Sequence, residues 1–555
     1  HRGRVHTGGA DATASVAATA EGAPAVPGAA SAPASAMMPA PGGERQVLLP
    51  TSESEAKKRV GVCTLVVIGF FWVSGGLYGN ETMVSSGPPL IVFLWTVLAG
   101  LCFALPNALM TAELATAFPV DGGQVVWTAE ACGPRIGGHN CFWVWFTNLL
   151  DAAVYPQIAA KYVSKALQLG LGSEQGICLA MVVCVAVTNC MGLDWVTASQ
   201  SVVFFLSLTP SLIFIVIGLG RLEPEVLTST EGETDWALLI SWALWLYSGF
   251  STLGSMAGEV ENPKYTYPAV VAFLLPLVIA LNVMPFAVAL SLDPDTEHYD
   301  AGYFGTLAGQ LSGLWLKTLF VVGANMAQVG LYHSQVIAAE RSCGAFVHAY
   351  LSDLGFTCLL PLNREAPPPS RLTPRMNEPP LEAAQTPMLH RRCLASLTLW
   401  LKTEPEGGGM SRANVLFNAT IAGCLTQFHL EALVEVEMML FACSHCLFLY
   451  SFIALRVQRP NVERPFQLPG GVQTAVCYCL LPFCFAVSAL LTNLYSSWEN
   501  TVAFVVVLSI GAIGHCIGSL MRWRIERAKE RSPDLTYTTR NGPSTTEYIA
   551  RIDPG

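Results

Sequence analysis

The sequence predicts an all-α polytopic membrane protein with about twelve transmembrane helices. Of its 555 residues, 52% are hydrophobic and only 13% are charged, about half the roughly 25% of ordinary globular domains. Long apolar stretches alternate with short polar loops along most of the chain. Lysine and arginine gather in every second loop, as in membrane proteins of fixed orientation. The net charge of −10 argues against a nucleic-acid partner, which requires a basic surface.

The candidate spans follow from the need for roughly 20 apolar residues to cross a bilayer. The expected spans are residues 60–84, 89–117, 139–168, 175–192, 196–219, 236–258, 267–291, 305–337, 413–428, 430–456, 472–493 and 498–521. We expect residues 56–219 and 236–456 to form two units of five helices each. Two trailing helices then follow within residues 472–521.

Three segments are expected to lie outside the helical body. Residues 1–55 and the insertion at about 361–411 are rich in small residues and proline, with few large apolar groups. Such composition predicts disorder. The basic residues 57–59 precede the first span and place the N-terminus inside, so an even number of spans makes residues 522–555 a cytoplasmic tail. Both termini are therefore expected in the cytoplasm, and the plasma membrane is the expected location.

The first span is interrupted by residues that form helices poorly. The stretch FFWVSGGLYGNE carries Ser74, Gly75 and Gly76 in its middle and ends in the carboxylate of Glu81. An unpaired backbone amide in hydrocarbon costs several kcal/mol, so irregular chain persists there only when it is buried in protein or lines a wet cavity. This break therefore predicts a binding site.

A second interruption begins the second group of five spans. In WALWLYSGFSTLGSMAGEVENP, Ser248 and Gly249 interrupt an apolar segment, and Glu259 follows. Interrupted segments at matching positions in two halves indicate an inverted-repeat transporter. The alternative is that these small residues only allow helices to pack closely.

Acidic side chains inside the spans are the next candidates, because each costs roughly 2.5–3.5 kcal/mol at mid-span and is usually functional. Asp151 lies four residues before Tyr155, so the two share a helix face. It is expected to bind substrate or a proton, or else to form a buried hydrogen bond between helices. Glu113, near the inner end of the second span, is expected either to carry a proton or to act structurally.

Cysteine spacing predicts neither a metal site nor a disulfide framework. The 17 cysteines are mostly scattered singly through apolar runs. The pair Cys443 and Cys446 lies inside an apolar span with no second pair at zinc spacing, which favours packing over metal binding. No nucleophile and base occur at usable spacing, so we expect neither an enzyme nor a cofactor.

Several of these motifs resemble one known family. The stretches VSGGLYGNE (73–81), TAELATAFPVDGGQVVW (111–127), LLDAAVYP (149–156) and AGEVENPKYTYP (257–268) resemble the amino acid–polyamine–organocation superfamily. The greatest similarity is to the polyamine and amino-acid permeases of plants and trypanosomatid protozoa. The resemblance covers about residues 60–523, apart from the insertion. It implies a five-plus-five inverted repeat of the LeuT type, two trailing helices and alternating access.

The resemblance also assigns roles to particular positions. It implies that Ser74, Gly75 and Gly76 form the unwound stretch of the first span. Phe250 matches the aromatic gate residue of the sixth span, where many relatives have tryptophan. The next position, acidic in some polyamine-carrying relatives, is Ser251 here, and the fifth span lacks the lysine of some proton-coupled relatives.

Together these observations predict a secondary transporter for polyamines of the putrescine or spermidine type, or for amino acids. The expected substrate-binding residues are Ser74, Gly75, Gly76, Glu81, Asp151, Tyr155, Tyr247, Ser248, Gly249, Phe250, Ser251 and Glu259. Proton coupling through Glu113 or Asp151 is expected, with sodium as the alternative ion. A neutral or basic amino-acid transporter and a non-transporting membrane sensor are the alternative functions. The expected partners are a small amine or amino acid and the lipid bilayer, and the sequence does not indicate a partner subunit.

Overall fold

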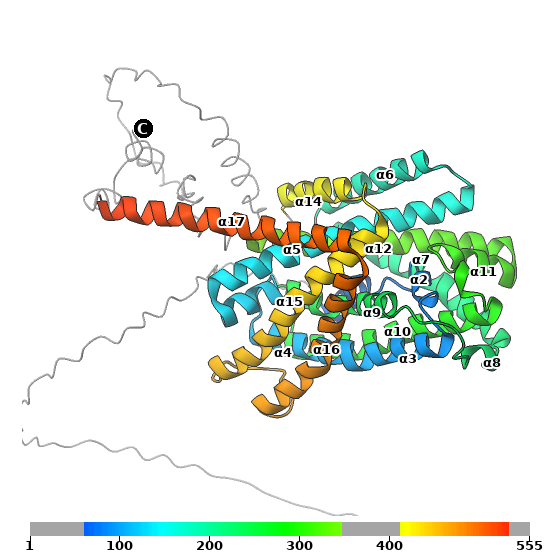
Figure 1. Ribbon diagram of the computed structural model, residues 1–555, viewed down its shortest axis with the longest axis horizontal. Helices are drawn as coiled ribbons and strands as arrows, with labels where there is room; N and C mark the ends of the chain where they lie inside the picture. The colour runs from blue at the N-terminus through cyan, green and yellow to red at the C-terminus, as the bar shows by residue number, and fades with distance from the viewer. Residues whose placement is uncertain (1–59, 347–410, 532–555) are drawn as a thin grey trace, which may run out of the picture. The chain divides into compact units, whose positions relative to one another are not determined.

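The computed structural model describes residues 60–346 and 411–531, and this part of the chain is helical (Figure 1). Among the described residues, β-type pairing is confined to one parallel bridge between Val60 and Val260. The expected disordered segments, 1–55 and most of 361–411, lie outside the described residues, as does the tail from residue 532.

The helices follow one another along the chain with short connections. They are α1 (Val62–Val73), α2 (Glu81–Val84), α3 (Pro89–Ala99), the π-helix η1 (Gly100–Ala104), α4 (Leu105–Ala117), α5 (Gln124–Leu167), α6 (Leu171–Cys190), α7 (Leu193–Gly218), η2 (Leu219–Arg221), α8 (Pro224–Leu227), α9 (Trp236–Trp245), η3 (Ser248–Met256), α10 (Pro263–Leu292), η4 (Thr296–His298), α11 (Tyr303–Ser312), α12 (Leu314–Phe346), α14 (Arg412–Leu425), α15 (Leu430–Gln458), α16 (Val472–Ser496) and α17 (Trp498–Arg531).

Within the described part of the chain, nine helical segments are long and apolar enough to cross a membrane. They are Pro89–Ala117, Gly172–Cys190, Trp195–Arg221, Trp236–Met256, Pro263–Leu292, Leu314–Gly344, Leu430–Gln458, Val472–Ser496 and Trp498–Cys516. The predicted fold class, an all-α polytopic membrane protein, is thereby confirmed.

The other three expected spans are helical but are not among these nine. The helices α1 and α14 have 12 and 14 residues. At 1.5 Å per residue, 14 residues extend about 21 Å, less than the roughly 30 Å of a hydrocarbon core. The 44-residue α5 is long enough, but polar residues such as Asn148 and Asp151 interrupt its apolar sequence. A total of twelve spans therefore stays a prediction.

The eighth expected span, 305–337, is divided in the structure. Gly313 adopts φ +84°, a left-handed conformation that favours glycine, and it separates the short α11 from the long α12. The apolar segment consequently begins at Leu314 and extends beyond the predicted end.

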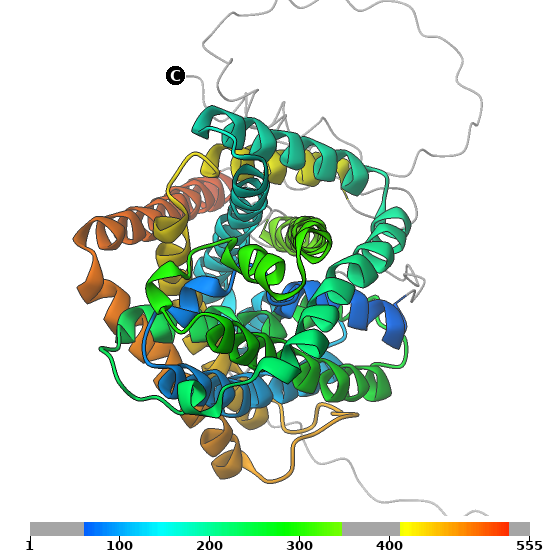
Figure 2. The ribbon, with the colours of Figure 1, turned by 90° about the vertical axis from the view of Figure 1, so that its right-hand side faces the viewer.

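The centre of the helical body is built on α5. This helix packs against α12 and α15, and α12 packs in turn against α7. Figure 2 shows α12 nearly end-on in lime green, with α6 and α7 in teal beside it. The shorter α14 lies alongside α6 (Figure 1). Side chains near the middle of α5 are therefore enclosed by several helices.

Both predicted helix breaks are present, and they differ in form. After α1 ends at Val73 the chain is non-helical until α2, with Gly75 at φ +61° and Gly76 at φ +106°. At the second break, α9 gives way to the 3₁₀-helix η3, nine residues long. Runs of 3₁₀-helix longer than three or four residues are uncommon and often mark a hinge or strain.

The two breaks lie against each other. A Cβ atom added to Gly249 would lie 1.9 Å from the carbonyl oxygen of Trp72 and 2.9 Å from the Cα atom of Val73. The backbones of η3 and α1 therefore touch, and only glycine at position 249 permits this approach. Segments about 170 residues apart are thus brought into direct contact by the fold.

Candidate functional site

Asp151 is the buried acid nearest to the two breaks. It is 6% exposed in the middle of α5, and the Tyr155 hydroxyl donates to its carboxylate at 2.7 Å. The predicted shared helix face of these two residues is thereby confirmed. The Gln335 amide of α12 also donates to Asp151, and the indole of Trp245 at the end of α9 interacts with it. Three elements therefore converge on one carboxylate.

A small cavity lies beside Asp151. Its volume of about 10 Å³ is close to the minimum that holds one water molecule. It is lined by Trp72, Val73, Ser74, Asp151, Tyr155, Trp245, Leu246, Ser248 and Leu331. The structure thus brings together four predicted residues, one from each break and two from α5: Ser74, Ser248, Asp151 and Tyr155.

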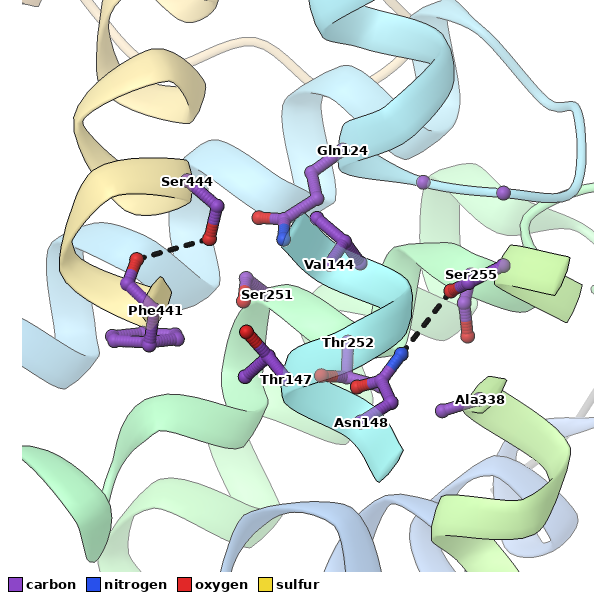
Figure 3. A pocket seen from close by; sticks show the side chains of 13 residues that line it. Gln124, Val144, Thr147, Asn148, Ser251, Thr252, Ser255, Ala338, Phe441 and Ser444 are labelled. Atoms are coloured by element: carbon purple, nitrogen blue, oxygen red, sulfur yellow. Dashed lines mark hydrogen bonds between the residues drawn. The ribbon is translucent and has the colours of Figure 1, made fainter. Parts of the chain in front are cut away.

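A second, larger cavity continues along α5 (Figure 3). It measures about 40 Å³, and Figure 3 shows side chains of α5, η3 and α15 turned toward it. Its lining is mostly hydroxyl and amide groups, among them Gln124, Thr147, Asn148, Ser251, Thr252, Ser255, Ser342 and Ser444.

Several polar atoms of this lining lack hydrogen-bond partners in the described part of the chain. They are Gln124 Oε1, Thr147 Oγ1 and Ser255 Oγ. Because buried polar groups almost always find partners, these atoms fit a space that holds water or a polar solute. Asn148 lies three residues from Asp151, about 4.5 Å along the helix axis, so the two cavities are successive.

Glu81 lies in a different place. It is fully buried, accepts hydrogen bonds from the backbone N–H groups of Gly79 at 2.9 Å and Gly302 at 3.2 Å, and also accepts from the Tyr162 hydroxyl. The neighbouring Asn80 donates to Asn282 of α10 at 2.8 Å. Glu81 therefore ties α2 to α5 and to the loop before α11, and it does not line either cavity.

Glu259 follows η3 and forms an ion pair with Arg341 of α12. Arg341 Nε also lies 3.6 Å from Glu340 Oε2, and Asp121 Oδ1 accepts from the Gly258 N–H at 2.9 Å. Burial raises the pKa of Asp121, which lies in the loop before α5, and the charge of Arg341 opposes this rise. This network joins α12 to the chain that follows the second break.

Glu113 is enclosed by arginines. Arg456 of α15 contacts it through Nε at 2.9 Å and Nη2 at 2.5 Å, and Arg464 Nε lies 3.4 Å away. The Leu468 N–H donates to the same carboxylate at 2.8 Å. By sequence these two arginines and Arg341 resemble the basic residues of inner loops that mark orientation. In the structure they instead pair with buried acids.

The remaining predicted residues are close to the breaks but line neither cavity. Gly75 lies against Leu331, where an added Cβ would meet the side chain at 2.5 Å. Tyr247 and Phe250 are completely buried, and Gly76 and Gly249 shape the backbone. Among the described residues, no group of three or more histidine, cysteine or acidic side chains is placed to hold a metal ion.

Sequence reasoning missed three side chains around Asp151: Gln335, Trp245 and Glu437. Glu437 of α15 is 3% exposed and interacts electrostatically with Asp151. The sequence carried a signal for it, because it is an acid within the apolar run LVEVEMML. Gln335 and Trp245 had no such signal, since only the fold brings them to α5.

The fold and the site together define a polytopic helical membrane protein whose interrupted helices meet beside a buried carboxylate. Residues 61–349 match the model of the amino acid permease family, so the chain belongs to that family. The resemblance to the amino acid–polyamine–organocation superfamily is confirmed by this match and by curated relatives. Family membership indicates a transporter rather than an enzyme.

Similar proteins extend over most of the chain. A probable polyamine transporter of Arabidopsis thaliana is 26% identical over 509 residues, covering 89% of this chain and 92% of that protein. Another Arabidopsis thaliana polyamine transporter is 25% identical, covering 81% of this chain and 84% of its own. A polyamine transporter of Oryza sativa subsp. japonica is 26% identical, with 85% and 79% covered.

Proposed function

We propose that this protein is a secondary active transporter that moves polyamines of the putrescine or spermidine type across a membrane by alternating access. One observation carries the proposal: Asp151 lies buried beside both helix breaks, and its contacts within the described residues include no basic side chain. An ammonium group is the natural partner for such a carboxylate, because a buried charge requires an opposite charge or several hydrogen bonds. The names of the relatives support the same substrate class.

The aromatic surroundings of Asp151 suit an ammonium group. The rings of Tyr155 and Trp245 lie 6.4 Å apart, and both line the cavity. A cation placed over such a ring gains about 0.5–2 kcal/mol, depending on how well it is desolvated. The methylene chain of a polyamine would at the same time contact the apolar ring faces. The cavity must widen to admit it, which fits a protein that alternates between conformations.

An amino acid is the second candidate substrate, and the first break argues against it. Its carboxylate would need free backbone amides at Ser74–Gly76. The N–H groups of Ser74 and Gly75 instead donate to the Phe70 carbonyl at 2.9 Å, and the Gly76 N–H points to Ser74 Oγ at 3.4 Å. Because these amides have acceptors within the chain, a polyamine is favoured.

The architecture that we propose is the LeuT-type repeat of five plus five helices, with units at 56–219 and 236–456 and trailing helices at 472–521. The contact between Gly249 and Trp72 supports it, since the broken helices of such a repeat meet at the substrate site. The polar cavity of Figure 3 would form part of the inner route. We place both termini in the cytoplasm and the protein in the plasma membrane.

Proton coupling is proposed through Asp151, with sodium as the alternative ion. Glu113 is a weaker candidate because two arginines and a backbone amide already occupy its carboxylate. Transport measured in proteoliposomes under an imposed pH gradient or sodium gradient separates the two ions. Accumulation driven by sodium alone would contradict the proton assignment.

The substrate is tested by uptake of labelled putrescine, leucine and arginine into a transport-deficient host. We expect putrescine to accumulate, and Asp151→Asn to reduce its uptake at least about tenfold, since a hydrogen bond to a charged group contributes about 1.5–3 kcal/mol. Asp300→Asn is the control, because Asp300 is 70% exposed in its pair with Lys165. Uptake of leucine without putrescine would refute the proposal, and saturable binding without any flux would indicate a sensor.

A further inference from the structure

Glu437 is the second carboxylate of the site region. It lies on α15 among apolar side chains that are themselves buried, including Val436, Met438 and Met439. Its Oε2 atom has no hydrogen-bond partner within the described part of the chain. A carboxylate that is 3% exposed with an unused oxygen is costly, because it has lost its hydration without replacement.

Asp151 and Glu437 meet at one donor. The Trp245 side chain interacts with both carboxylates, and an indole offers a single N–H. Asp151 has the Tyr155 hydroxyl and the Gln335 amide as further donors, and the described residues offer Glu437 no equivalent donor. Gln335 in turn has an Oε1 atom without a partner among these residues. The pair is therefore short of donors on the Glu437 side.

The two acids are not balanced by a base in the described ranges. None of the ion pairs found within residues 60–346 and 411–531 includes Asp151 or Glu437. The buried arginines 341, 456 and 464 are engaged with Glu259 and Glu113. Two neighbouring buried carboxylates without a cation repel each other, and a ligand that brings two positive charges would relieve this repulsion.

We propose that Asp151 and Glu437 form a two-carboxylate site that binds two ammonium groups of one linear polyamine, with the Trp245 indole between them. This inference rests on the proposed function and assigns its substrate specificity. Asp151 holds the ammonium group nearest the breaks, and Glu437 holds the next one along the chain. The methylenes between them lie on the ring of Trp245. An amino acid offers one ammonium group, and its carboxylate would be repelled by the second acid.

The test is binding of putrescine and of butylamine to the purified full-length protein. Both amines have a four-carbon chain, but butylamine has only one ammonium group. We expect Glu437→Gln to weaken putrescine binding by about tenfold to a hundredfold, the value of one charged hydrogen bond. Butylamine binding should change by less than about threefold, because it needs only Asp151.

The matched control is Glu435→Gln, two residues away on the same helix. Glu435 is half-buried, and its Oε2 accepts from Asn500 at 2.6 Å, away from Asp151. Its substitution should leave the putrescine-to-butylamine ratio unchanged. If Glu437→Gln does not yield folded protein, Glu437→Asp keeps the charge but shortens the side chain by one methylene. We then expect the preferred diamine to change from putrescine to the longer cadaverine.

The outcomes separate the two proposals. If the wild-type protein binds putrescine and Glu437→Gln keeps its preference over butylamine, the two-carboxylate site is wrong and the proposed function stands. The two-carboxylate site is likewise wrong if Glu437→Asp still prefers putrescine. If the wild-type protein binds an amino acid and neither amine, the proposed function itself has failed.

Discussion

Gly249 is the residue on which the contact between the two breaks depends. A side chain there would have to occupy the space of the Trp72 carbonyl group, which belongs to the backbone and cannot rotate away. Gly254 is in a related position, because an added Cβ would lie 2.2 Å from the Trp127 ring. Two glycines of η3 therefore let this helix pack against α1 and α5.

We predict that Gly249→Ala lowers both the stability and the transport of the protein. Inserting one methyl into a closely packed interior usually costs about 1–3 kcal/mol, and here the opposing atoms are backbone. Gly176→Ala on α6 is the matched control, since nothing lies within 4 Å of its added Cβ. Thermal unfolding of detergent-purified protein measures the effect. Equal midpoints for the two variants would contradict the close approach.

The helix α15 connects two separate parts of the molecule. Glu437, near its beginning, reaches Asp151, while Arg456, near its end, pairs with Glu113 of α4. Arg456 also donates to the carbonyl groups of Leu468 and Gly470, which follow α15. One element thus positions a candidate site residue and anchors the loop before α16.

We predict that Glu113→Gln destabilises the fold by about 3–5 kcal/mol, the usual cost of breaking a buried ion pair. Glu130→Gln is the control, because its 3.6 Å contact with Arg459 involves a guanidinium that is 55% exposed and contributes only about 0–1 kcal/mol. Chemical denaturation in detergent measures both. A stable Glu113→Gln protein that no longer responds to a pH gradient would show that Glu113 carries the proton.

The turn between α10 and α11 is the element expected to respond to pH. His298 Nδ1 lies 3.1 Å from Asp293 Oδ2, and this contact, with the charge of Asp295, raises the pKa of His298. Partial burial raises the pKa of Asp293, but hydrogen bonds from Tyr303 and His298 outweigh it, so the net shift is downward.

We predict that this turn is most ordered when both groups are charged. The contribution of His298 is complete below its ordinary pKa of about 6.5 and is lost as the pH rises through its raised pKa. The contribution of Asp293 is present above its ordinary pKa of about 3.9 and is lost as the pH falls through its lowered pKa. Hydrogen exchange of residues 293–303, corrected for intrinsic rates, measures both transitions. His298→Gln should abolish the upper one alone, and its persistence would refute the assignment.

At the scale of the whole molecule, local patterns were predictable and distant contacts were not. The Ser74–Gly76 break and the shared face of Asp151 and Tyr155 depend only on neighbouring residues, so the sequence contained them. The pairing of Glu113 with Arg456 joins residues 343 positions apart. No spacing rule reaches that far, and the arginines consequently resembled ordinary loop charges.

The number of spans was limited by the same cause. Short helices such as α14 satisfy the apolar pattern but fall below the length that crosses a bilayer unaided, and α5 is longer but more polar. Helices that are enclosed by others need less apolar surface, because protein rather than lipid surrounds them. Hydropathy alone therefore does not count the spans at the centre of such a protein.

The parallel bridge at Val60 has a mechanical consequence. The Val60 N–H donates to the Glu259 carbonyl at 3.1 Å, and the Glu261 N–H donates to the Val60 carbonyl at 2.9 Å, so the chain before α1 is fastened to the chain after η3. The two broken helices are coupled like paired oars, and neither can swing while its companion rests. Damage to one should produce the same defect as damage to the other.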